Sequence, residues 1–72
     1  MEKQKFNLTE RQRQVMDYIE EYYAENGITP TQGAIAKEMG IAQATIAKHL
    51  ASIERRGWIQ RARGLKNGMT IL

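Results

Sequence analysis

The sequence contains no cysteine, and only one histidine, one proline and one tryptophan, among its 72 residues. Without cysteine the chain forms no disulfide and no thiolate metal site, and one histidine does not build a metal site by itself. No apolar run approaches the roughly 20 residues that cross a bilayer, and the charged start MEKQKFNLTERQ lacks the apolar segment of a signal peptide. We therefore expect a cytoplasmic protein with no metal, no cofactor and no small-molecule ligand.

The length also argues against an enzyme. A chain of this size forms one domain with one small core and has little room for a deep substrate pocket. Ser52 is the only serine and follows Lys48 by four residues, so the two side chains share a helix face. A Ser-Lys pair is catalytic in some enzymes, but it also needs an oxyanion hole and a cleft. We predict that the chain is not an enzyme.

The positive charge is concentrated in the second half of the chain. Residues 1–38 carry five basic and seven acidic side chains, whereas residues 39–72 carry six basic and one acidic. Such an asymmetric charge attracts phosphate backbones and accelerates encounter with them. A solvated basic face with no ligand is the ordinary alternative.

The stretch from Gln32 to Ala51 has the spacing of two short helices joined by a tight turn. Ala36 is small enough for a second helix to cross it, Gly40 tolerates the positive φ of the turn, and Ile46 points an apolar side chain back at the first helix. The remaining buried residues are expected to be Ile35, Met39, Ile41 and Leu50. This pattern predicts a helix-turn-helix whose second helix enters the DNA major groove. An αα-corner of a small helical domain is the alternative.

A longer helix is predicted before this pair. Thr9 and Gln12 form a capping box, and Gly27 supplies a left-handed cap, which gives a helix over about 10–26. Its apolar stripe is Val15, Met16, Ile19, Tyr22 and Tyr23, of which the two tyrosines are expected to lie partly in the core and partly on the surface. Its outer face is acidic, with Asp17, Glu20, Glu21 and Glu25. Residues 1–7 are predicted to be a mobile arm, and the domain to span residues 8–72.

The remaining elements complete a three-helix domain with a hairpin. Thr31 caps a second helix over about 32–39, and Gly57 ends a third over about 43–56, at whose start Ala42 is a poor cap. Residues 58–72 contain two short apolar runs around Asn67-Gly68, which is a strong hairpin signal. The predicted fold is mainly α with a small β-hairpin, a winged helix-turn-helix.

Candidate DNA contacts follow from this arrangement. Gln43 is suited to a bidentate pair with adenine, Ala44 to a thymine methyl group, and Lys48 to a guanine or a phosphate. Thr45 either reaches a phosphate or bonds its own helix backbone. Arg55 and Arg56 either bind phosphate or only complement the negative end of the helix. The predicted interface on the third helix and the wing is Gln43, Ala44, Thr45, Ala47, Lys48, Arg55, Arg56, Arg61, Arg63 and Lys66.

Nearly the whole chain resembles a known family. The segment LTERQRQVMDYIEEYYAENGITPT, followed by IAKEMGI and HLASIERRGWI, is similar to the DNA-binding domain of LexA repressors. The resemblance covers about residues 8–72 and implies transcriptional regulation, by repression, in a bacterium or phage, through binding to double-stranded DNA at the nucleoid. It does not imply proteolysis, because the self-cleaving Ser-Lys domain of the LexA family, which also dimerises it, has no counterpart in this sequence.

Two departures from the family pattern affect the interface. The segment GIAQATIAKHL is one residue shorter at the turn, so a LexA-type operator is not implied. Gly33 and Ala34 occupy positions where the family usually carries charged residues.

Two other hypotheses remain open. Winged helices also serve as protein-interaction modules, and Tyr22 or Tyr23 with Trp58 is a candidate homodimer patch. The chain is alternatively an excised domain of a longer LexA-like repressor; the starting Met1 and a hairpin ending at Leu72 favour a complete chain.

Overall fold

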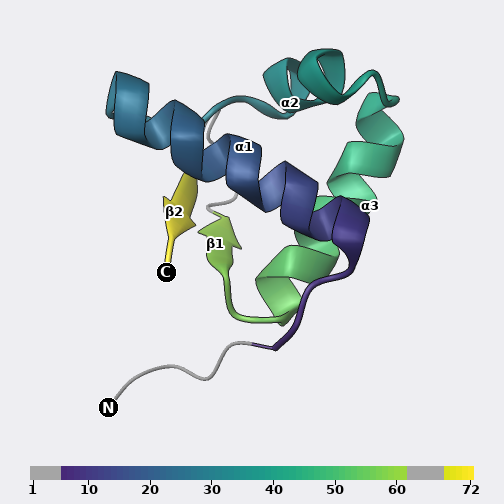
Figure 1. The fold of residues 1–72 in the computed structure, drawn as a ribbon. Coiled ribbons are helices and arrows are strands. Elements are labelled where there is room, and N and C mark those ends of the chain that lie inside the picture. The colour runs from purple at the N-terminus through teal and green to yellow at the C-terminus, as the bar shows by residue number, and fades with distance from the viewer. Residues whose placement is uncertain (1–5, 62–67) are drawn as a thin grey trace.

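The computed structural model describes residues 6–61 and 68–72. It contains the helices α1 (Glu10–Asn26), α2 (Gln32–Met39) and α3 (Gln43–Arg55), followed by strands β1 (Ile59–Arg61) and β2 (Met69–Ile71). Figure 1 shows α1 crossing the molecule, α2 and α3 meeting at one corner, and the hairpin following α3. The predicted winged helix-turn-helix is confirmed.

The caps visible in the sequence set the ends of the first two helices. The Thr9 side chain accepts a hydrogen bond from the Gln12 main-chain N–H, and the Gln12 side chain accepts one from Thr9 in return. Gly27 ends α1 with a φ of 75°. Thr31 caps α2 and Gly40 ends it with a φ of 67°, a left-handed conformation that glycine adopts without a Cβ penalty.

The third helix ends close to the predicted bound, just before Gly57. It stops at Arg55, Arg56 leaves the helical path, and Gly57 follows with a φ of 87°. Its start is poorly capped, as predicted, because Ala42 offers no side-chain hydrogen bond to the first turn.

One apolar core joins all three helices and the hairpin. The buried apolar side chains come from α1, α2, α3 and β1 and are Val15, Met16, Ile19, Ile35, Ala36, Ile46, Leu50, Ile53 and Ile59. Met39 and Ile41, predicted to be buried, pack against this core while partly exposed, as do Trp58, Met69 and Ile71. The first strand pairs antiparallel with the second, with Ile59 opposite Ile71 and Arg61 opposite Met69.

The segment before α1 is tied to the end of α3. The Phe6 N–H donates to the Arg56 carbonyl at 3.0 Å, and the Trp58 indole N–H donates to the Phe6 carbonyl at 2.7 Å. The Arg56 guanidinium donates to the Asn7 carbonyl. Phe6 and Asn7 are thus held in place, in contrast to the mobile arm expected there; residues 1–5 of that arm lie outside the described residues.

Candidate nucleic-acid interface

The turn between α2 and α3 fixes the direction of the proposed recognition helix. Gly40 turns the chain, and the Ile41 N–H then donates to the Ala36 carbonyl at 3.0 Å. Ala36 is buried where the two helices meet, and Ile46 is completely buried from the α3 side. Since Ile46 and Leu50 face the core, the opposite face of α3 must face solvent.

The exposed side of α3 presents most of the residues predicted to contact DNA. Gln43, Ala44, Thr45 and Lys48 are exposed, and Ala47 is half-buried. The structure thus brings these five together on the first two turns of one helix. Their positions accord with the prediction, while their contacts with DNA remain predictions.

The first turns of α2 and α3 touch through polar side chains. The Gln32 side-chain amide donates to the Gln43 main-chain carbonyl at 3.2 Å. The Gln43 side chain lies against Gly33, where an added Cβ would be 3.4 Å from Gln43 Nε2. Sequence reasoning missed the role of Gln32, because nothing in a single sequence signals a polar contact between two turns.

The two arginines at the end of α3 differ in their surroundings. Arg55 is exposed in the last turn. Arg56 is half-buried, and its guanidinium is bonded to the Asn7 carbonyl. In the free protein Arg56 therefore anchors the N-terminal segment, whereas Arg55 faces solvent.

The wing residue Arg61 is paired with α3. Its Nε donates to Glu54 Oε1 at 3.0 Å and its main-chain N–H donates to Glu54 Oε2 at 3.1 Å. Both side chains are about one-third exposed, at 35% and 34%. Arg61 thus links the wing to α3. The other two wing candidates, Arg63 and Lys66, and the predicted turn residue Asn67 lie outside the described residues.

Trp58 packs at the base of the wing. Besides its bond to Phe6, the ring lies under the Arg13 guanidinium, with 5.1 Å from Arg13 Cζ to the ring centroid. Such a contact is a cation–π interaction. Packing at the wing base, rather than base stacking, is thus what Trp58 does in the free protein.

Ser52, the serine weighed as a nucleophile, faces α1. Its Oγ accepts a hydrogen bond from the Gln12 side-chain amide at 2.9 Å, and Gln12 is buried, with 7% of its surface exposed. Lys48 is exposed. Ser52 therefore has a structural role, in joining α1 to α3.

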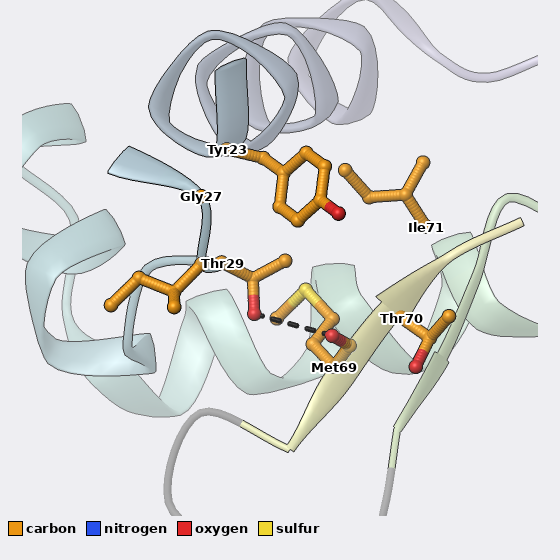
Figure 2. A pocket seen from close by; sticks show the side chains of 7 residues that line it. Tyr23, Gly27, Thr29, Met69, Thr70 and Ile71 are labelled. Atoms are coloured by element: carbon orange, nitrogen blue, oxygen red, sulfur yellow. Dashed lines mark hydrogen bonds between the residues drawn. The ribbon is translucent and has the colours of Figure 1, made fainter. Parts of the chain in front are cut away.

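A second surface lies at the other end of α1. A pocket of about 380 Å³ is lined by Tyr23, Gly27, Ile28, Thr29, Met69, Thr70 and Ile71. In Figure 2 the Tyr23 ring and the Ile71 side chain flank it, and the Thr29 hydroxyl donates to the Met69 carbonyl at 3.2 Å. Tyr23 and Ile28 are 50% and 54% exposed. Trp58, which was expected to join an exposed tyrosine in a dimer patch, does not line this pocket.

The acidic and histidine side chains of the described residues form no metal site. No group of three or more His, Asp or Glu side chains in residues 6–61 and 68–72 is placed to hold an ion. Over the same residues, no helix is both long and apolar enough to cross a membrane.

On α1, burial raises the pKa of Tyr18, and the nearby Glu38 and Tyr22 raise it further.

Comparison with known proteins places the chain near one family. Residues 5–67 match the family model of the LexA DNA binding domain. The chain is 37% identical over 67 residues to the LexA repressor of Desulfatibacillum aliphaticivorans, an alignment that covers 92% of this chain and 33% of the relative. It is 42% identical over 64 residues to that of Alcanivorax borkumensis, covering 82% and 31%. The chain spans about a third of the length of these relatives, and the resemblance seen in the sequence is confirmed.

Proposed function

The chain belongs to the LexA DNA-binding domain family, and from this premise we propose that it binds double-stranded DNA sequence-specifically as a small transcriptional repressor. The observation that carries the proposal is the exposed row at the start of α3. Gln43, Ala44 and Lys48 lie on the face opposite buried Ile46 and Leu50, so a rigid helix presents them outward. That face fits the major groove, which admits an α-helix.

Each α3 side chain has a role in this proposal. Gln43 pairs with adenine, Ala44 contacts a thymine methyl group, and Lys48 bonds a guanine or a phosphate. Thr45 reaches the backbone, and half-buried Ala47 lets the helix approach the groove closely. The uncapped start of α3 leaves main-chain amides to which a phosphate is attracted.

The basic residues beyond these turns divide into two groups. Exposed Arg55 binds phosphate. Arg56 and Arg61 hold the N-terminal segment and the wing through internal bonds; because a guanidinium carries five donors, a phosphate contact by either is compatible with those bonds. Arg63 and Lys66 contact the backbone or the adjacent minor groove from the wing.

A single module buries roughly 600–1,000 Å² on DNA, which favours weak binding by one copy. We propose that useful occupancy comes from a second copy or a partner protein on a neighbouring site. The protein acts by binding alone, without catalysis, a cofactor or a small-molecule ligand, in the cytoplasm at the nucleoid.

Selection of bound sequences from a random DNA pool tests the proposal. A conserved motif should emerge, and its symmetry should report the number of copies bound. Gln43→Ala and Lys48→Ala should each weaken binding to the selected site, by about 1–3 kcal/mol for a bidentate contact. Recovery of no motif, or unchanged affinity in both variants, contradicts the proposal.

A protein-interaction module is the second candidate. The pocket lined by Tyr23, Ile28, Met69 and Ile71 favours it, because two of these apolar side chains are about half exposed. Ile28→Asp should then abolish self-association measured by sedimentation while binding to a single DNA site stays unchanged. Self-association that persists in Ile28→Asp would show that the pocket is not the contact surface.

A further inference from the structure

The first residues of α2 and α3 meet although eleven positions separate them in the chain. Gln32 begins α2 and Gln43 begins α3, and the Gln32 side-chain amide donates to the Gln43 main-chain carbonyl at 3.2 Å. A carbonyl has two lone pairs, so this bond is compatible with the helical bond of the same oxygen. The hydrogen bond joins the first turn of the proposed recognition helix to the preceding helix.

The neighbouring glycine leaves space for the side chain of Gln43. A Cβ built at Gly33 would lie 3.4 Å from Gln43 Nε2 and 3.9 Å from Gln43 Cδ. Gly33 sits within α2, and it is not among the glycines with a positive φ, which within residues 6–61 and 68–72 are Gly27, Gly40 and Gly57. The backbone conformation therefore does not require a glycine there, whereas the Gln43 amide lies where a larger side chain would be.

From these two contacts we infer that Gln32 and Gly33 are positioning residues for Gln43 and set which base it reads. The inference rests on the proposed DNA binding. A bidentate contact to adenine requires the amide oxygen and nitrogen to be aimed together, and a side chain restrained before binding loses less rotamer freedom when it binds. Gln32 holds the first turn, and Gly33 gives the Gln43 amide a surface to lie against.

The effect of a substitution at Gly33 on the Gln43 side chain should depend on the size of the new side chain. An alanine Cβ at 3.4 Å from Nε2 is in ordinary van der Waals contact, so Gly33→Ala should leave Gln43 in place. Valine adds two γ carbons on that Cβ, and because its rotamer in a helix is nearly fixed we expect one of them to crowd the amide. Gly33→Val should therefore redirect Gln43, while Gly33→Ala is its matched control.

Selection from a random DNA pool, followed by titrations on single-base variants of the selected site, measures the effect. The base pair read by Gln43 is the one at which Gln43→Ala loses discrimination. At that base pair alone, Gly33→Val should lose roughly tenfold in discrimination, Gln32→Ala should lose part of it, and Gly33→Ala should keep it. The dependence on salt should be unchanged in all three, and Gly33→Val should have no further effect in a Gln43→Ala background.

A role confined to folding predicts a different result. In that case Gly33→Val and Gln32→Ala lower the melting temperature and leave base preference untouched, which overturns the inference. The side-chain amide resonances of Gln43 give a readout without DNA: they should shift in Gly33→Val and Gln32→Ala and stay in place in Gly33→Ala.

The outcomes separate this inference from the proposed function. A parent chain with no sequence preference contradicts both. A parent with a clear motif that Gln43→Ala leaves unchanged contradicts the inference and the role given to Gln43, but it leaves sequence-specific binding by the rest of α3 standing.

Discussion

Glu54 accepts two hydrogen bonds from Arg61, one from the main-chain N–H at 3.1 Å and one from Nε at 3.0 Å. Because Glu54 lies in the last turns of α3 and Arg61 ends β1, this pair links α3 to the wing. Glu54 is also the only acidic residue in the basic half of the chain. Its place in the pair explains why a negative charge occurs there.

Removal of this carboxylate should loosen the wing. Glu54→Ala should lower the free energy of unfolding by about 1 kcal/mol, a modest amount because both side chains are one-third exposed. The amide resonances of β1 and β2 should shift with it. Glu21→Ala, which removes an exposed charge on α1, is the matched control, and equal shifts of the wing in both variants would contradict the assigned role.

The hydrogen bond between the Gln12 and Ser52 side chains should contribute more to the free energy of unfolding than the Glu54–Arg61 pair does. Ser52→Ala leaves the Gln12 amide donor without this acceptor inside the protein, which costs roughly 1–3 kcal/mol. Gln12→Ala also removes half of the capping box. Gln14→Ala, on the exposed face of α1, should stay within about 0.5 kcal/mol of the parent. Urea denaturation measures all three, and a Ser52→Ala value as small as that of Gln14→Ala would refute the link.

Replacement by alanine should have opposite effects on stability at Gly33, which lies within α2, and at Gly40, which ends it. At Gly33, whose backbone is helical, alanine should raise stability by about 0.5–1 kcal/mol. At Gly40, an added Cβ meets nothing within 4 Å, but the φ of 67° strains any L side chain by about 1–2 kcal/mol. Thermal unfolding should therefore give a melting temperature above that of the parent for Gly33→Ala and below it for Gly40→Ala. Destabilisation by Gly33→Ala would indicate that the Gln43 contact leaves less room than described.

The salt dependence of DNA binding should report the number of phosphate contacts. With about five contacts, the slope of log K against log salt should be near −4.5. Lys48→Ala should reduce its magnitude by about 0.9 if Lys48 binds phosphate, and leave it unchanged if Lys48 bonds a guanine edge. Lys37→Ala, which removes an exposed charge outside the predicted interface, should have no effect. A parent slope near zero would remove the electrostatic basis of the interface.

The sequence predicted the helices well because their ends depend on local chemistry. Thr9 with Gln12, Gly27, Thr31 and Gly40 each act within a few residues, so their spacing specifies α1 and α2 directly. The end of α3 was also predicted closely, since Arg56 caps the helix and Gly57 follows in the left-handed conformation, but the bond from the Arg56 guanidinium to the Asn7 carbonyl was not predicted. That interaction joins residues 49 positions apart and leaves no periodic pattern.

The same reason limits what sequence reasoning found in the interface. The exposed row on α3 followed from the burial of Ile46 and Leu50, which periodicity shows. The partners of Arg61 and Gln43 within the protein could not be predicted in this way, because polar side chains on a surface pair by three-dimensional proximity. Gly33 entered the sequence analysis only as a departure from the family pattern, whereas its contact is with a side chain of the next helix.

Both described ends of the chain converge on Trp58. Its indole N–H bonds Phe6, and its carbonyl accepts the Leu72 N–H at 3.0 Å. As it is the only tryptophan, its fluorescence is a built-in reporter: detachment of the Phe6 segment, which is bonded to the indole itself, should alter the emission without any attached dye.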